Sequence, residues 1–219
     1  MKRYFLELFG TFALVFCGAG AIVMNDASGG AVTHVGIALT FGLIVMAMIY
    51  SIGAQSGAHI NPAVTIAFWA SGTFDKKDVF PYVAAQITGA VLASAVLYCL
   101  FPEHATQGAT LPLNSYSQAF VIEALLSFIL MFVILNVSTG SKEKGITAAL
   151  AVGGVVAFEA IFAGPICGAS MNPARSIAPA FFSGDLTHLW LYVVATILGA
   201  ILAVYSCKLV QAEECCDNC

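Results

Sequence analysis

The sequence predicts an all-α membrane protein with six transmembrane helices and two re-entrant half-helices, arranged as an inverted 3+3 repeat. Three observations support this fold class. The chain of 219 residues is 60% hydrophobic and only 9% charged, whereas a soluble domain carries about 25% charged residues. The apolar residues fall in long, separate runs, and one motif-bearing block occurs twice, once in each half of the chain.

Six apolar runs are long enough to form membrane-spanning helices, since about 20 apolar residues cross the hydrocarbon core. The first, residues 4–24, follows Met1-Lys2-Arg3 and contains Glu7. A charged residue there argues against a cleaved signal peptide, so we expect a retained helix. Barrel strands would instead alternate over segments of about ten residues. The other spans are expected at 34–53, 82–101, 117–138, 146–164 and 189–210.

The two halves of the chain repeat each other. Residues 57–67 read GAHINPAVTIA and residues 168–178 read GASMNPARSIA. Residues 82–94 and 192–204 also match, with small residues at four-residue spacing that let helix backbones approach closely in lipid. Each repeat holds three spans, an odd number, so the second must enter the membrane from the opposite face. We expect the first repeat over 1–113, the second over 114–211, and a Cys-rich tail at 212–219.

Each repeat also contains a short helix that begins at its Asn-Pro-Ala motif. About ten helix-compatible residues follow Pro62 and Pro173, giving about 15 Å of helix, half of the bilayer core. They predict two half-helices that enter from opposite sides and meet at their N-termini. The Gly-rich stretches before them, 54–60 and 164–171, are expected to be non-helical. Such backbone survives at membrane depth only beside protein or water, so a water-filled pore follows.

The motifs Asn61-Pro62-Ala63 and Asn172-Pro173-Ala174 are the first candidate site. Asn is a common N-cap and Pro a common first helical residue. The helix dipoles add partial positive charge at the same place, which disfavours a cation or a proton wire. We expect both Asn amides to point N–H groups into the pore; the alternative is that they only cap the half-helices.

Arg175 replaces Val64 of the first repeat and is the second candidate. A charge at membrane depth usually faces a wet cavity, and a guanidinium can donate to a polar solute while repelling cations; the alternative is an interfacial Arg.

The other seven Lys and Arg residues lie on segments that six spans place on one side of the membrane. The positive-inside rule then predicts a multi-pass protein of the cell membrane with both termini cytoplasmic.

Two acidic residues, Glu7 and Glu123, occupy equivalent positions in spans 1 and 4. They are expected either to couple protons, as in transporters, or to accept hydrogen bonds from the irregular backbone before each half-helix. Glu159 has no counterpart in the other repeat. Of the histidines, His59 is expected at the pore mouth, and the other three in loops or at interfaces: His34, His104 and His188.

The spans contain no catalytic constellation, phosphate loop or metal-ligand spacing, and no basic patch suggests nucleic acid. We therefore expect no enzyme, no cofactor, no metal and no nucleic-acid partner; the lipid bilayer is the expected partner. Cys215, Cys216 and Cys219 cluster near the end of the chain. Thiolates suit soft ions, so this tail is expected either to bind a metal or metalloid or to be a disordered terminus.

The motif-bearing blocks resemble those of the major intrinsic protein family, the aquaporins and aquaglyceroporins. The resemblance rests on SGAHINPAVT at 56–65, GASMNPARS at 168–176, and Glu7 followed by Gly10-Thr11-Phe12, and it extends over essentially the whole chain. It implies the aquaporin fold, with one pore per subunit in a homotetramer. It also implies a second constriction on the outer side of the pore, a selectivity filter formed here by Phe41, Ala160, Ala169 and Arg175.

The residues at those four positions bear on the cargo. In the family, strict water channels usually carry His where this chain has Ala160, and glycerol facilitators usually carry two aromatic residues where it has only Phe41. Together with FAGPICGASMNPARS at 162–176, this ring is similar to the nodulin-26-like branch and its bacterial relatives. The resemblance therefore implies a passive channel for water, glycerol and uncharged metalloid acids such as arsenite. The alternatives are a secondary transporter that uses membrane carboxylates, a strict water channel, and a structural protein with a closed pore.

Overall fold

The computed structural model describes residues 1–138 and 142–210. The predicted tail at 212–219, with Cys215, Cys216 and Cys219, lies outside these residues. The described chain is all-helical, which confirms the predicted fold class. Its six long helices are α1 (Lys2–Ala27), α2 (Thr33–Ser56), α4 (Lys76–Leu100), α5 (Tyr116–Ser138), α6 (Lys142–Cys167) and α8 (Leu189–Val210). The two short ones are α3 (Pro62–Ser71) and α7 (Pro173–Ser183).

Each long helix holds an apolar stretch of 21 to 26 residues, enough by length and composition to cross a membrane. Two boundaries differ from expectation. Helix α4 starts at Lys76 rather than near residue 82 and contains Pro81. Pro81 is the sixth residue of the helix and lacks the N–H that would bond to the carbonyl of Lys77. The non-helical stretches are shorter than expected, 57–61 and 168–172, because α2 continues to Ser56 and α6 to Cys167.

The half-helices α3 and α7 are defined by matching signals at both ends. Each has Asn as N-cap and Pro at its first position, where the missing N–H costs nothing. Each stops at a glycine in the left-handed region, Gly72 with φ 94° and Gly184 with φ 79°. At ten and eleven residues they are about half as long as a bilayer-spanning helix.

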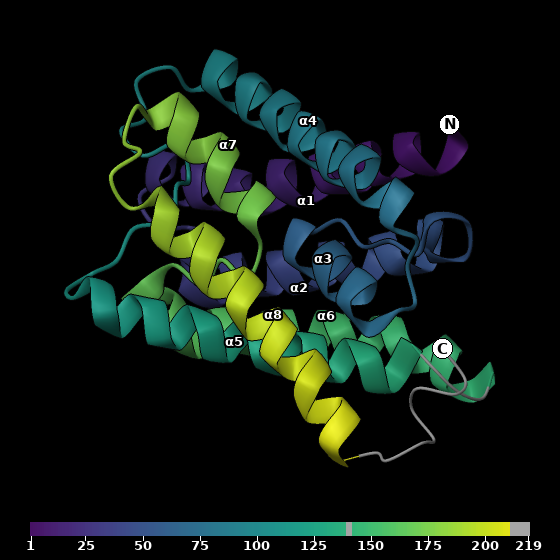
Figure 1. Ribbon diagram of the computed structural model, residues 1–219. Helices are drawn as coiled ribbons and strands as arrows, with labels where there is room; N and C mark the ends of the chain where they lie inside the picture. Colours follow the sequence, from purple (N-terminus) through teal and green to yellow (C-terminus); the bar gives the residue numbers. More distant parts are fainter. Residues whose placement is uncertain (139–141, 211–219) are drawn as a thin grey trace.

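The long helices surround α3 and α7, which lie in the interior and meet at their N-termini (Figure 1). Helix α1 packs against α4, α5 against α8, and α2 against α6. Each half-helix also packs against a long helix of the other repeat, α3 on α8 and α7 on α4. We call the side with Met1 and Val210 the terminal face, and the side with the segment 101–115 the loop face.

The closest helix contacts are made by glycines at matching places in the two halves. A Cβ built on Gly89 of α4 would lie 2.1 Å from the carbonyl oxygen of Leu8 on α1. A Cβ on Gly199 of α8 would lie 2.0 Å from that of Ala124 on α5. Real Cβ atoms do not come so near backbone oxygens, so only glycine fits these crossings, which set the spacing of both helix pairs.

Candidate functional site

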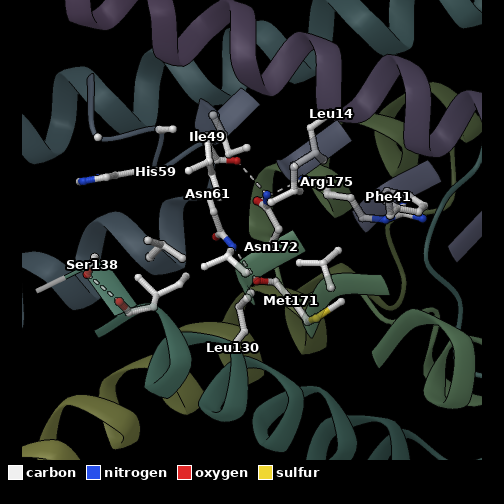
Figure 2. Close-up of a pocket in the computed structure, with 18 of the residues that line it drawn as sticks. Leu14, Phe41, Ile49, His59, Asn61, Leu130, Ser138, Met171, Asn172 and Arg175 are labelled. Atoms are coloured by element: carbon white, nitrogen blue, oxygen red, sulfur yellow. Dashed lines mark hydrogen bonds between the residues drawn. The ribbon is translucent and has the colours of Figure 1, made fainter. Parts of the chain in front are cut away.

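Asn61 and Asn172 stand face to face where the two half-helices meet (Figure 2). The side-chain oxygen of Asn61 accepts from the N–H of Ala63 at 2.9 Å, and that of Asn172 accepts from the N–H of Ala174 at 3.0 Å. Each amide nitrogen donates across the junction, Asn61 to the carbonyl of Met171 at 2.8 Å and Asn172 to that of Ile60 at 2.9 Å. One N–H of each amide is thus used in the cross-link, which leaves the second for the cavity that both residues line.

The backbone before each motif is strained in the same way in both halves. Ala58 and Ile60 have φ of 46° and 41°, and Ala169 and Met171 have φ of 43° and 54°. Residues with a Cβ rarely adopt such angles, and each instance costs of order 1–3 kcal/mol. In each segment the two residues with positive φ are separated by one residue that is not among the positive-φ residues. Strain of this kind persists only where surrounding groups hold it.

Buried carboxylates hold these strained segments. Glu7 of α1 accepts from the N–H groups of His59 at 3.0 Å and Ile60 at 2.7 Å. It also accepts from Ser56 Oγ at 2.9 Å and Gln86 Nε2 at 2.8 Å. The side chain of Glu7 is fully buried, so these four donors replace its hydration.

Glu123 of α5 does the same for the second segment. Its two oxygens accept from the N–H groups of Ser170 at 2.8 Å and Met171 at 3.0 Å. Tyrosines complete the match: Tyr82 donates to the carbonyl of Ser56, the last residue of α2, and Tyr192 to that of Cys167, the last residue of α6. Both junctions are therefore tied to the surrounding long helices.

Two cavities meet at a shared set of wall residues. The first, of about 110 Å³, runs from His59 and Ser138 past both Asn residues to Phe41 and Arg175 (Figure 2). The second, of about 210 Å³, opens at the loop face. Three residues line both cavities: Phe41, Ala169 and Arg175. Ala160 lines the second cavity only. The structure thus brings together all four residues that the sequence proposed for the constriction.

Arg175 is 2% exposed, and its environment fixes the guanidinium in place. Nη1 donates to the carbonyl of Gly108 at 2.8 Å, and Cζ lies 4.9 Å from the ring centroid of Phe41, a cation–π contact. Nε has no hydrogen-bond partner within the described chain. A buried guanidinium with spare N–H donors beside a cavity is suited to bind a passing oxygen atom.

Phe41 depends on a glycine that the sequence analysis did not single out. A Cβ on Gly18 of α1 would lie 2.1 Å from Cε1 of the Phe41 ring. The ring therefore occupies the space that any larger residue at position 18 would fill. Only the structure shows this dependence, since the two positions lie on different helices.

His59 lies in the first cavity toward the terminal face. Its Nδ1 is 3.1 Å from Thr65 Oγ1, and its ring stacks on Phe68 with centroids 4.7 Å apart. Two further aromatic rings, Phe74 and Tyr82, surround it. The ring is thus held by packing on three sides and lines the wall of the cavity.

Two other polar residues have no role in this network. Glu159 of α6 is fully buried, and neither carboxyl oxygen has a hydrogen-bond partner in the part of the chain that the structure describes. His34, which was expected in a loop or at an interface, is the second residue of α2 and lines the loop-face cavity. Residues 1–138 and 142–210 contain no group of three His, Cys, Asp or Glu side chains placed to hold a metal ion.

Known proteins with similar sequences identify the family to which this architecture belongs. The family model described as major intrinsic protein matches residues 1–206. Aquaporin NIP1-1 of Zea mays is 44% identical over 212 residues, which cover 96% of this chain and 75% of that protein. Aquaporin NIP3-1 of Arabidopsis thaliana is 44% identical over 216 residues, covering 95% of this chain and 67% of that protein.

A solved structure agrees with the sequence relatives. The aquaglyceroporin from Plasmodium falciparum superposes with a TM-score of 0.88 at 27% identity, covering 98% of both chains. The resemblance to the nodulin-26-like branch is confirmed by the NIP-type relatives. The fold, the paired motifs and the family match agree, and the chain belongs to the major intrinsic protein family.

Proposed function

We propose that this protein is a passive channel for water and small uncharged solutes, glycerol among them. The observation that carries the proposal is the meeting of two cavities at Phe41, Ala169 and Arg175, with the paired Asn caps behind them. A path with one narrow polar ring selects by size and by hydrogen bonding. The family membership supports the same function.

The electrostatics of the path favour neutral cargo. The N-termini of α3 and α7 converge on the two Asn residues and bring the positive ends of two helix dipoles together. Arg175 adds a full positive charge at the ring, where the first cavity meets the loop-face cavity. Cations meet repulsion at both places, and the donors at the Asn junction interrupt a chain of water molecules that would conduct protons.

The ring is wide on one side because two of its members are alanines. Ala160 and Ala169 contribute only methyl groups, so Phe41 is its single aromatic wall and Arg175 its single charged group. A solute larger than water but rich in hydroxyl groups fits this combination of space and donors. Uncharged metalloid acids such as arsenite have the same character, and we include them in the proposed cargo.

The test is to measure water, glycerol and arsenous acid permeability in the same proteoliposomes by stopped-flow light scattering. All three rates should exceed those of protein-free vesicles. Permeability to water but not to glycerol or arsenous acid would indicate a strict water channel. Rates equal to those of empty vesicles for all three solutes would indicate a structural protein with a closed pore.

A secondary transporter is the competing function. It requires a carboxylate that exchanges partners during the cycle, whereas Glu7 accepts four hydrogen bonds and Glu123 holds two backbone N–H groups. Glycerol uptake should therefore be unchanged when ionophores collapse proton and sodium gradients. Uptake that stops with the gradients would favour the transporter.

We further propose a homotetramer in the cell membrane with the terminal face in the cytoplasm. The apolar side chains exposed on the long helices are available both to lipid and to neighbouring subunits. Native mass spectrometry in detergent should give the mass of four subunits.

The orientation has its own test. A cysteine introduced at Glu103 on the loop face, in a variant without natural cysteines, should react with an impermeant maleimide applied outside intact cells.

A further inference from the structure

A histidine joins two helices beside the narrow ring. His34 Nε2 lies 2.7 Å from the carbonyl oxygen of Ile161, which connects the start of α2 to α6 across 127 positions of the chain. The side chain is solvent-exposed and lines the loop-face cavity. It therefore lies on the wall of this cavity, and its partner Ile161 is the residue after Ala160 on α6.

The carbonyl of Ile161 is available because of a proline. In an α-helix this carbonyl would accept from the N–H four residues later, but that residue is Pro165, which has no N–H. The imidazole supplies the missing donor. A carbonyl oxygen only accepts, so Nε2 must carry the proton, and in the neutral ring Nδ1 is left with a lone pair.

A glycine makes room for the imidazole. A Cβ built on Gly164 would lie 3.0 Å from Cε1 of His34, tighter than nearly all real Cβ contacts. Gly164 is one helical turn beyond Ala160 on α6 and lines the same cavity. The ring is therefore seated against α6 just outside the constriction, and Nδ1 makes no hydrogen bond within residues 1–138 and 142–210.

The loop-face cavity has few polar side chains. Of the residues that line it, only His34 and Arg175 carry polar side chains; the others are apolar or glycine. Arg175 can only donate hydrogen bonds. A hydroxyl group both donates and accepts, and Nδ1 of His34 is the side-chain acceptor that this cavity offers to a polyol.

We propose that His34 is a solute-contacting residue of the loop-face cavity, selective for small polyhydroxy solutes. Its Nδ1 accepts a hydrogen bond from one solute hydroxyl while Arg175 donates to another oxygen. The inference rests on the proposed channel function and adds a selectivity element outside the four-residue ring. Water, which is small and exchanges partners easily, depends on this acceptor much less than glycerol.

The experiment compares glycerol and water permeability of proteoliposomes with equal pH on both sides. His34→Leu, which has no acceptor, should lower glycerol permeability about fivefold, the equivalent of one hydrogen bond, with water permeability nearly constant. His34→Gln, which can both donate and accept, should keep most of the glycerol flux.

Matched controls separate a solute contact at His34 from a purely structural role of the same side chain. His188→Gln, on the same face but against Tyr116, should behave as wild type. If His34→Leu lowers water and glycerol equally, His34 only ties α2 to α6 and the proposal is wrong. Glycerol permeability of His34→Leu equal to that of wild type would also overturn it. Wild-type vesicles with water flux but no glycerol flux would instead indicate a strict water channel and refute the proposed glycerol conduction, together with this inference.

Discussion

At the scale of single residues, the narrow ring combines one guanidinium, one aromatic ring and two methyl groups. Arg175 can remain charged while buried because Gly108 and the face of Phe41 replace part of its hydration. Gly18 in turn leaves free the space that the ring of Phe41 occupies. The arrangement of this ring therefore depends on a few contacts that single substitutions can remove, and we propose that its selectivity depends on the same contacts.

Replacing Arg175 with Val, the residue at the matching position of the first repeat, should relax the exclusion of ions. The substitution removes the fixed charge and the donors at the ring and places a small apolar side chain at this position of α7. We expect water permeability within about threefold of wild type and a measurable cation conductance in planar bilayers. Ion exclusion equal to that of wild type would show that Arg175 is not the barrier.

The change Ala160→His should reduce glycerol permeability more than water permeability. An imidazole on α6 would narrow the ring by the volume of a five-membered ring and place a second polar group opposite Phe41. We expect glycerol flux to fall about tenfold or more and water flux by less than about threefold, measured in the same vesicles. Equal losses for both would contradict the position assigned to Ala160.

Replacing Glu159 with Gln should leave the protein at least as stable as wild type. Neither carboxyl oxygen accepts a hydrogen bond within the described residues, so the substitution breaks no contact, while it removes a group whose ionised form is costly to bury. The midpoint of thermal unfolding in detergent should stay equal or rise. A clear fall would mean that Glu159 makes an interaction through bound water or through the chain beyond the described residues.

Sequence could identify the site residues whose signal is local. The two Asn-Pro-Ala motifs, and Arg175 beside the second, were visible because the repeats can be compared position by position. His34 and Gly18 could not be found in this way. The partner of His34 lies 127 positions away and depends on Pro165 freeing a carbonyl, and Gly18 matters only because α1 packs against α2.

At the scale of elements, the half-helices are held by the long helices around them. Their strained N-terminal segments are fixed by a carboxylate from α1 or α5 and by a tyrosine from α4 or α8. Those pairs of long helices cross at Gly89 and Gly199. The close crossings therefore also place the groups that hold the junctions.

Substituting alanine for Gly199 should destabilise the protein. The new Cβ would lie 2.0 Å from the carbonyl oxygen of Ala124, which belongs to the backbone and cannot rotate away. We expect a loss of about 1–3 kcal/mol in unfolding free energy and lower water permeability per folded molecule. The measurements are reversible unfolding in detergent and stopped-flow permeability.

The matched control is Gly154→Ala on α6, where a new Cβ meets no atom within 4 Å. Alanine is favoured over glycine inside a helix by roughly 0.5–1 kcal/mol, so this variant should be as stable as wild type or more so. Similar losses in both variants would show that the close crossing at Gly199 is not the cause.

The helices themselves were largely predictable, because apolar runs of about 20 residues in a chain with so little charge have few other structures available. The ends of the helices were less predictable. Helices α2 and α6 continue into stretches expected to be irregular, since hydrogen bonds from Tyr82 and Tyr192 satisfy the carbonyls of Ser56 and Cys167. Such long-range partners leave no local sequence signal.

At the scale of the whole molecule, two copies of one three-span unit build a path that neither could form alone. Each half-helix packs against a long helix of the other repeat, and each Asn donates to a carbonyl of the other repeat. We propose that the division at residues 113 and 114 is therefore one of sequence and ancestry, not of independent folding. Residues of both halves line the first cavity, and we propose that charge is selected at the Asn junction and size at the ring.

The central claim is passive conduction of small uncharged solutes, and glycerol flux in proteoliposomes tests it most directly. With no other gradient present, labelled glycerol should equilibrate at a rate proportional to its concentration difference and stop at equal concentrations inside and outside. An imposed proton or sodium gradient should change neither the rate nor the end point. Accumulation above the external concentration, driven by either gradient, would contradict the channel account.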